Sequence, residues 1–163
     1  MKAVNVKSVG NSEQLEIIDL PVPKIKANQV LVKTVAAGVN RPDILQRRGL
    51  YNPPPDASKI LGLEISGKIV EIGDEVPSNL VGQNIFALTH GGGYAEYCAV
   101  DYNHCLLLPP NLSFSEAACI PETAFTVFYN LFLIGGLKEG DKVLIHGGSG
   151  GIGSTAIQMA RLA

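Results

Sequence analysis

The sequence predicts a mainly β domain followed by the opening segment of an α/β domain with a parallel sheet. Residues 1–120 contain short β-branched and apolar runs separated by Gly, Pro, Asn and Asp, which is typical of an all-β domain. After Ile120, apolar residues recur at helical spacing, and a β-branched run then enters a glycine cluster that leads into a second helical segment. We therefore expect two domains, residues 1–120 and 121–163.

The strands expected in the first domain are short and closely spaced. In chain order they are residues 2–6, 15–20, 30–36, 65–72, 85–88, 94–100 and 105–108. The run 30–36 is apolar enough to be buried on both faces, and Gly67 is expected to interrupt the run 65–72. The consecutive prolines at 53–55 force an extended loop before that run.

Capping residues and apolar spacing predict the helices. Asn40 is a plausible N-cap of a short helix, and Ser113 with Glu116 fits a capping box. A longer helix is expected from Thr123, where apolar residues follow helical spacing, and Gly135-Gly136 should end it. The last helix is expected from Ser154 onward.

A glycine cluster follows the β-branched run 142–146, which we predict to be a strand. Gly148, Gly150 and Gly153 satisfy the pattern G-x-G-x-x-G in a strand–turn–helix setting. Glycine gives a tight turn there, lets the backbone approach a pyrophosphate, and permits close helix–strand packing. The alternative is a glycine-rich loop that only feeds a helix. We assign dinucleotide binding to the backbone of Gly147, Gly148, Gly150, Gly151, Ile152 and Gly153.

Composition describes a globular chain with few charges. Of 163 residues, 46% are hydrophobic and 17% charged, and the formal net charge is −2. These values give no electrostatic reason to expect nucleic acid or an anionic membrane as a partner. The longest apolar stretch, residues 125–134, is too short to span a bilayer. Because no signal-peptide pattern or paired-cysteine spacing is present, we expect a cytoplasmic protein with reduced thiols.

Four stretches in order resemble one family, the medium-chain dehydrogenase/reductases: residues 37–43, 62–67, 120–126 and 146–153. More narrowly, the chain resembles the zinc-independent, zeta-crystallin-like quinone oxidoreductases, and residues 40–55 are most similar to the tumour-suppressor-inducible members. The resemblance implies a GroES-like β-domain and a Rossmann domain, with cofactor and substrate between them. Zinc-dependent members carry cysteine where this chain has Asn40 and histidine where it has Leu63, so the resemblance implies no metal.

The resemblance also implies roles for three side chains. Tyr51 would donate a hydrogen bond to a quinone oxygen as charge develops there, although it could simply pack on the prolines of its loop. Asn40 would donate its amide to the nicotinamide ribose or to substrate, in addition to or instead of capping a helix. Thr126 would lie near the nicotinamide, or be an ordinary helical threonine. Asp43 suits the dipole of its helix, and Glu64 is expected to be mainly structural.

The implied reaction is metal-independent transfer of reducing equivalents from a nicotinamide cofactor to a quinone. Reduction of an enone or enoyl alkene is one alternative, and a non-catalytic binding or crystallin-like module is another. The residue that selects NADH or NADPH is normally found about 20 residues past the glycines, beyond Ala163, and NADPH is expected only from the resemblance. We expect this chain to be a fragment of a protein that forms homodimers when complete.

Overall fold

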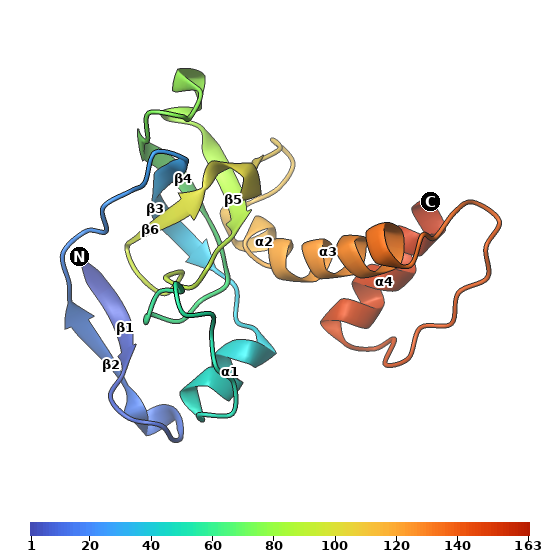
Figure 1. Cartoon of the computed structure of the whole chain (residues 1–163), viewed down its shortest axis with the longest axis horizontal. Coiled ribbons are helices and arrows are strands. Elements are labelled where there is room, and N and C mark those ends of the chain that lie inside the picture. Colours follow the sequence, from blue (N-terminus) through green and yellow to red (C-terminus); the bar gives the residue numbers. More distant parts are fainter. The chain divides into compact units, whose positions relative to one another are not determined.

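The computed structural model describes all 163 residues, which divide into two compact units, Met1–Cys119 and Ile120–Ala163. The division falls beside the predicted boundary at Ile120. Figure 1 shows that the first unit contains all of the strands and the second consists of helices and a long connection.

A five-stranded antiparallel sheet forms the body of the first unit, with strand order β6-β3-β4-β5-β7. Its strands are β3 (Gln29–Ala37), β4 (Glu64–Ile72), β5 (Asn84–Leu88), β6 (Tyr97–Asp101) and β7 (Cys105–Leu107). One face of this sheet encloses the core, to which β3, β4, β5 and β6 contribute apolar side chains at alternate positions. The buried core residues are Val30, Val32, Ile65, Ile69, Val76, Ile85, Ala87, Cys98 and Val100.

A separate hairpin forms the N-terminal part of the same unit. Strands β1 (Lys2–Val6) and β2 (Leu15–Asp19) pair antiparallel and are joined through the 3₁₀ turn η1 (Ser12–Gln14). The hairpin is tied to the segment before β6, because the Val4 N–H donates to the Tyr94 carbonyl (2.9 Å) and Ala3 bridges Ala95. Further 3₁₀ turns are η2 (Ser78–Leu80) and η3 (Tyr102–His104).

The structure corrects three details of the predicted strands. Strand β3 is buried on both faces only at its start: Lys33 is exposed, as is Val35 (58%), since pairing with β6 stops at Lys33. Gly67 does not interrupt β4, because the lack of a Cβ there lets the Lys33 carbonyl of β3 approach closely. Strand β6 begins only at Tyr97, since the preceding residues pair with other segments.

Two short helices complete the first unit, and both begin as predicted. Helix α1 (Arg41–Arg47) has Asn40 as its N-cap. Helix α2 (Phe114–Ala117) begins with the expected capping box: the Ser113 hydroxyl accepts from the Glu116 N–H (3.3 Å), and the Ser113 N–H donates to the Glu116 carboxylate (2.9 Å).

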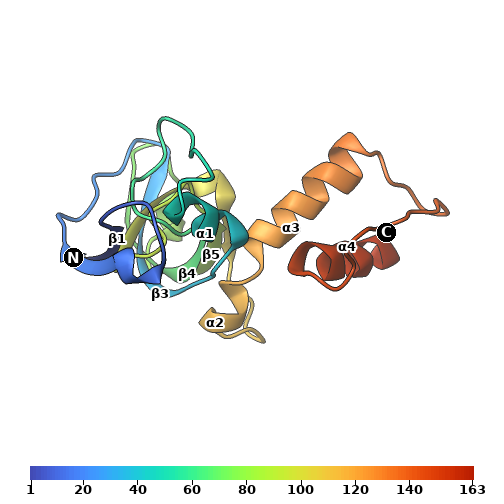
Figure 2. The same cartoon turned by 90° about the horizontal axis from the view of Figure 1, so that it is seen from below.

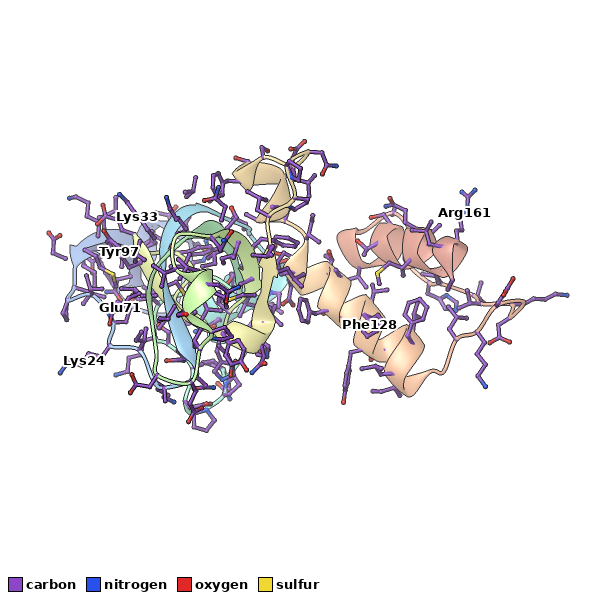
Figure 3. All side chains as sticks on the ribbon, turned by 90° about the horizontal axis from the view of Figure 1, so that it is seen from above. Lys24, Lys33, Glu71, Tyr97, Phe128 and Arg161 are labelled. Carbon is purple, nitrogen blue, oxygen red and sulfur yellow. The ribbon has the colours of Figure 1, made fainter.

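The second unit contains α3 (Pro121–Val127), its π-helical continuation η4 (Phe128–Ile134), and α4 (Gly151–Leu162). Helices α3 and α4 lie side by side in both views (Figures 1 and 2). The predicted stop is confirmed, because Gly136 takes a positive φ of 63° and the Leu137 N–H caps the Leu131 carbonyl (3.0 Å). Phe128 and Phe132 stack at 5.6 Å between ring centroids, and Figure 3 shows Phe128 on this helical segment.

The predicted strand 142–146 is wrong for this structure. These residues are extended but pair with no strand, and Leu144 is 80% exposed. The physical reason is that a parallel strand needs a neighbour with which to exchange backbone hydrogen bonds, and the unit Ile120–Ala163 contains no strand. Helix α4 also begins three residues before the predicted Ser154, at Gly151.

One helical stretch, residues 114–134, is long and apolar enough to cross a membrane by length and composition. This stretch contains α2, α3, η4 and the residues between α2 and α3, 21 residues in all, and is longer than the run 125–134 considered in the sequence. A single stretch of this kind is weak evidence for a span, since helices in the cores of soluble proteins meet the same criteria.

Candidate functional site

Two buried carboxylates mark the centre of the site in the first unit. Asp43, in the first turn of α1, is 4% exposed, and Glu64, the first residue of β4, is 2% exposed. Burying an unpaired carboxylate costs several kcal/mol, so each must be held by donors. The donors that surround them define the geometry of the site.

The Asp43 carboxylate accepts hydrogen bonds from three segments of the chain. Its donors are the Asn40 N–H (2.9 Å), the Gly62 N–H (3.0 Å) and the Tyr94 hydroxyl (2.8 Å). Hydrogen bonds to an ionised acceptor are about twice as strong as neutral ones. Asp43 therefore does more than complement the dipole of α1: it fastens that helix to the segments before β4 and before β6.

Tyr94 is the residue of this network that the sequence analysis missed. Its hydroxyl lies between Asp43 and the Gly38 carbonyl (3.2 Å). Burial, reinforced by the Asp43 hydrogen bond and the charges of Asp43 and Glu64, raises the pKa of the phenol well above its ordinary value. The hydroxyl is therefore a neutral donor at physiological pH. The glycines at 91–93 that precede it were the only sequence signal of a close approach here.

The Asn40 side chain is fixed by Glu64. Its amide nitrogen donates to Glu64 Oε1 over 2.8 Å, and the carboxylate acceptor sets the orientation of the amide. Asn40 is at the same time the N-cap residue of α1, with an extended backbone, which confirms the capping alternative. Its donation to a nicotinamide ribose or to substrate stays a prediction. The second hydrogen of this amide has no hydrogen-bond partner in the protein.

Because Gly38 has no side chain, the Glu64 carboxylate and the Ala118 carbonyl can approach its backbone closely. A Cβ at Gly38 would collide with Glu64 Oε1 and would lie 2.6 Å from the Ala118 carbonyl oxygen. Gly62 is similarly constrained: its φ is 103°, and a Cβ would lie 2.7 Å from the Tyr94 nitrogen. The Gly62 carbonyl accepts from the Thr89 hydroxyl (2.8 Å). Only glycine fits either position without displacing backbone atoms of the site.

Tyr51 lies in the proline-containing loop and is 40% exposed. Its hydroxyl makes no hydrogen bond to another residue, so it does not join the network of Asn40, Asp43, Glu64 and Tyr94. The loop itself is anchored, because the Leu50 N–H donates to the Leu45 carbonyl (2.9 Å). The hydroxyl is thus presented to solvent on an anchored loop.

The glycine cluster of the second unit forms a turn that leads directly into α4. Gly147 has a φ of 69°, and its carbonyl accepts from the Gly150 N–H (3.1 Å). A Cβ at Gly153 would collide with that carbonyl and would lie 2.7 Å from the Gly148 Cα. Because the first N–H groups of a helix have no partner within it, those of residues 151–153 can bind an anion. Binding of a dinucleotide pyrophosphate at this turn stays a prediction.

Thr126 lies on α3 and is partly buried, and its carbonyl accepts from the Asn130 side chain (2.8 Å). Helix α3 packs against the start of α4, since Thr123 Cγ2 would lie 3.5 Å from a Cβ at Gly151. Thr126 therefore shares the second unit with the glycine turn, whereas Asn40 and Tyr51 belong to the first. Its role beside the nicotinamide stays a prediction.

No group of three or more His, Cys, Asp or Glu side chains in the chain is placed to hold a metal ion. Asn40 Nδ2 faces a carboxylate, and Leu63 offers no ligand atom. Cys98 is buried, which raises its pKa to about 12, and it is therefore a protonated thiol.

The β-domain topology and the glycine turn at the start of a helix together define the class of medium-chain dehydrogenase/reductases. Residues 26–110 match the model of the alcohol dehydrogenase GroES-like domain, and the chain belongs to that family. The predicted GroES-like fold is thereby confirmed.

Similarity extends over the whole chain. The chain is 37% identical to the quinone oxidoreductase of Sus scrofa over 163 residues, which cover 99% of this chain and 50% of that protein. The solved structure of the quinone oxidoreductase from Coxiella burnetii is 30% identical with a TM-score of 0.85, covering 99% of this chain and 53% of that one. CurK enoyl reductase is 29% identical with a TM-score of 0.88, covering 99% and 51%.

The predicted resemblance to quinone oxidoreductases is confirmed by these relatives. The chain spans about half the length of the curated relatives it matches.

Proposed function

We propose that this chain contributes the substrate-binding domain and the phosphate-binding turn of a metal-independent NAD(P)H:quinone oxidoreductase. The observation that carries the proposal is the hydrogen bond between Asn40 and Glu64 (2.8 Å). A buried carboxylate there orients a neutral amide donor, and the residue immediately before β4 is the aliphatic Leu63. Such a site binds and orients polar ligands but offers a metal no ligand set. Likeness to quinone oxidoreductases supports the same reaction.

A nicotinamide cofactor, when bound, would supply a hydride, which is the part of the reaction that protein side chains cannot perform. Residues 150–153 would hold its pyrophosphate through backbone N–H groups. Asn40 would donate its free amide hydrogen to the cofactor ribose or to the quinone. The Tyr51 hydroxyl would donate to the quinone oxygen on which negative charge develops. Because Tyr51 is 40% exposed, the proton that completes the hydroquinone can come from solvent.

We propose NADPH rather than NADH as the reductant. This choice rests on the resemblance to the zeta-crystallin-like branch alone, and no side chain of this chain bears on it. For the complete protein we propose a cytoplasmic homodimer without a nucleic-acid or membrane partner.

The test is quinone-dependent oxidation of NADPH. Both the chain and the longest polypeptide that its gene encodes are assayed with para-benzoquinone and phenanthrenequinone. We expect turnover with at least one quinone and a loss of roughly tenfold or more in Tyr51→Phe, by analogy with removal of an oxyanion donor. Tyr129→Phe is the matched control, since Tyr129 is also exposed (57%) but lies on η4. No turnover with any quinone or enone would refute the proposal.

Reduction of a conjugated alkene is the second candidate, and the likeness to CurK enoyl reductase favours it. A higher kcat/KM for a crotonyl thioester than for either quinone would assign the chain to this reaction instead. A non-catalytic module is the third possibility, because the chain spans about half of its relatives. Titration of the folded chain with NADPH distinguishes it, because a non-catalytic module would fold, bind NADPH weakly or not at all, and show no turnover.

A further inference from the structure

A cavity of about 380 Å³ lies in the unit Met1–Cys119, apart from the candidate site described above. It shares no residue with the site formed by Asn40, Asp43, Glu64 and Tyr94. Four segments form its walls: the strap 20–29 between β2 and β3, the loop 56–60, the glycine turn 90–92, and strand β6. Its volume falls within the range of about 300–1,000 Å³ that small-molecule sites occupy.

The walls of this cavity are fastened to one another by backbone hydrogen bonds. The Ser58 N–H donates to the His90 carbonyl (3.0 Å), and the Gly92 N–H donates to the Ile60 carbonyl (2.7 Å). Gly91 has a φ of 79°, and a Cβ there would lie 2.9 Å from the Ser58 carbonyl oxygen. The two loops therefore hold a fixed separation, and the cavity is formed before any ligand arrives.

The lining is mainly apolar and carries one lysine, Lys26. Ile60, Cys98 and Ala99 contribute apolar surface. Met1 also lines the cavity, and its backbone nitrogen donates to the Leu20 carbonyl (2.6 Å).

Two charged side chains of the lining differ in their partners. Asp56 is the only carboxylate of the lining, and it pairs with His90 at 3.1 Å. The Lys26 ammonium makes no ion pair within 4.0 Å. An anionic group entering the cavity would therefore find a cation available.

We propose that this cavity binds a small apolar molecule that carries one carboxylate, such as an aromatic carboxylate. The apolar body packs against Ile60 and Ala99, and the carboxylate faces Lys26. The binding does not depend on the reaction proposed above, because the cavity and the Asn40 site have no residue in common.

The test is a titration of the full chain with 2-naphthoate and with the neutral 2-naphthamide, followed by calorimetry and by amide NMR. We expect the naphthoate to bind more tightly than the amide, with shifts at Gly91 and Gly92. Lys26→Gln should weaken naphthoate binding about twofold to fivefold, the range of one partly exposed ion pair, and leave the amide unaffected. Lys24→Gln is the matched control, since Lys24 lies on the same strap, is exposed and does not line the cavity (Figure 3).

A second variant tests the volume of the cavity. Ala99→Leu should abolish binding of both probes, and circular dichroism verifies that this variant folds. Equal affinity for the two probes, an unchanged affinity in Lys26→Gln, or shifts confined to the glycine turn at 147–150 would each overturn the proposal.

Discussion

The Asn40 side-chain amide donates to Glu64 Oε1 over 2.8 Å, and this bond joins the N-cap of α1 to the first residue of β4. Asn40 thereby acquires a fixed orientation in a unit whose two buried acidic residues, Asp43 and Glu64, both serve the same turn. Buried carboxylates add less to stability than apolar side chains of the same size would. Their presence at this turn therefore indicates a role other than packing.

A double-mutant cycle between Asn40→Ala and Glu64→Ala should measure a coupling of about 1.5–3 kcal/mol in the free energy of unfolding, because the acceptor is charged and buried. Urea denaturation of the chain provides the four values. The matched pair is Asn28 and Asp101, which also form an amide–carboxylate bond (2.7 Å) but are only partly buried. A coupling at Asn40–Glu64 no larger than at that pair would mean that Glu64 does not hold Asn40.

Tyr94→Phe should lower the free energy of unfolding by about 1.5–3 kcal/mol, because it removes a donor to the ionised Asp43. Tyr102→Phe is the control: this tyrosine is partly buried against the core, and its hydroxyl has no hydrogen-bond partner. Its effect should stay within about 0.5 kcal/mol. Equal effects of the two substitutions would place the stabilising contribution of Tyr94 in its ring and not in its hydroxyl.

Alkaline conditions should destabilise the first unit through its buried thiols. Burial raises the pKa of Cys98 to about 12 from 9.0, and burial together with the Asp101 charge does the same at Cys105. Between these two pH values the unfolded chain loses protons that the folded chain retains. The contribution of these thiols to stability is therefore constant below pH 9.0 and falls as pH rises toward 12, by up to about 1.4 kcal/mol per pH unit for each thiol.

Urea denaturation over this pH range tests the expected slope. Cys105→Ala should reduce it, whereas Cys119→Ala, at an exposed position, should leave it unchanged. An identical slope in both variants would exclude the buried thiols as its cause.

Gly153→Ala should weaken NADPH binding by roughly tenfold or more, because its Cβ would collide with the Gly147 carbonyl and open the turn. Ser149→Ala should bind NADPH within about twofold of the parent, since backbone N–H groups make the cradle. Fluorescence titration of the longest encoded polypeptide measures both. Retention of tight binding in Gly153→Ala would show that the turn does not receive the pyrophosphate.

Local patterns in the sequence were sufficient for most elements of the fold. The capping box at Ser113 and the stop at Gly135-Gly136 are decided by neighbouring residues, so both are predictable. The strand at 142–146 was predicted from its β-branched residues, yet a strand also requires a partner, which no local pattern reports.

The candidate site was predictable only where a motif marked it. Asn40 and the glycine turn belong to recognisable stretches, whereas the bond from Tyr94 to Asp43 joins residues 51 positions apart. Long-range side-chain pairs of this kind follow from the register of the fold and are not visible in composition or periodicity. The role of Glu64 as the partner of Asn40 became apparent for the same reason only in the structure.

Metal-independent reduction of a quinone is the central claim, and one measurement tests it most directly. The longest encoded polypeptide is treated with EDTA, dialysed, and assayed for quinone-dependent NADPH oxidation with and without added zinc. The same kcat/KM is expected before treatment, after treatment and after zinc addition, because the resemblance to zinc-independent quinone oxidoreductases implies that Asn40 and Leu63 take the positions of zinc ligands. Loss of turnover on chelation that zinc restores would contradict it.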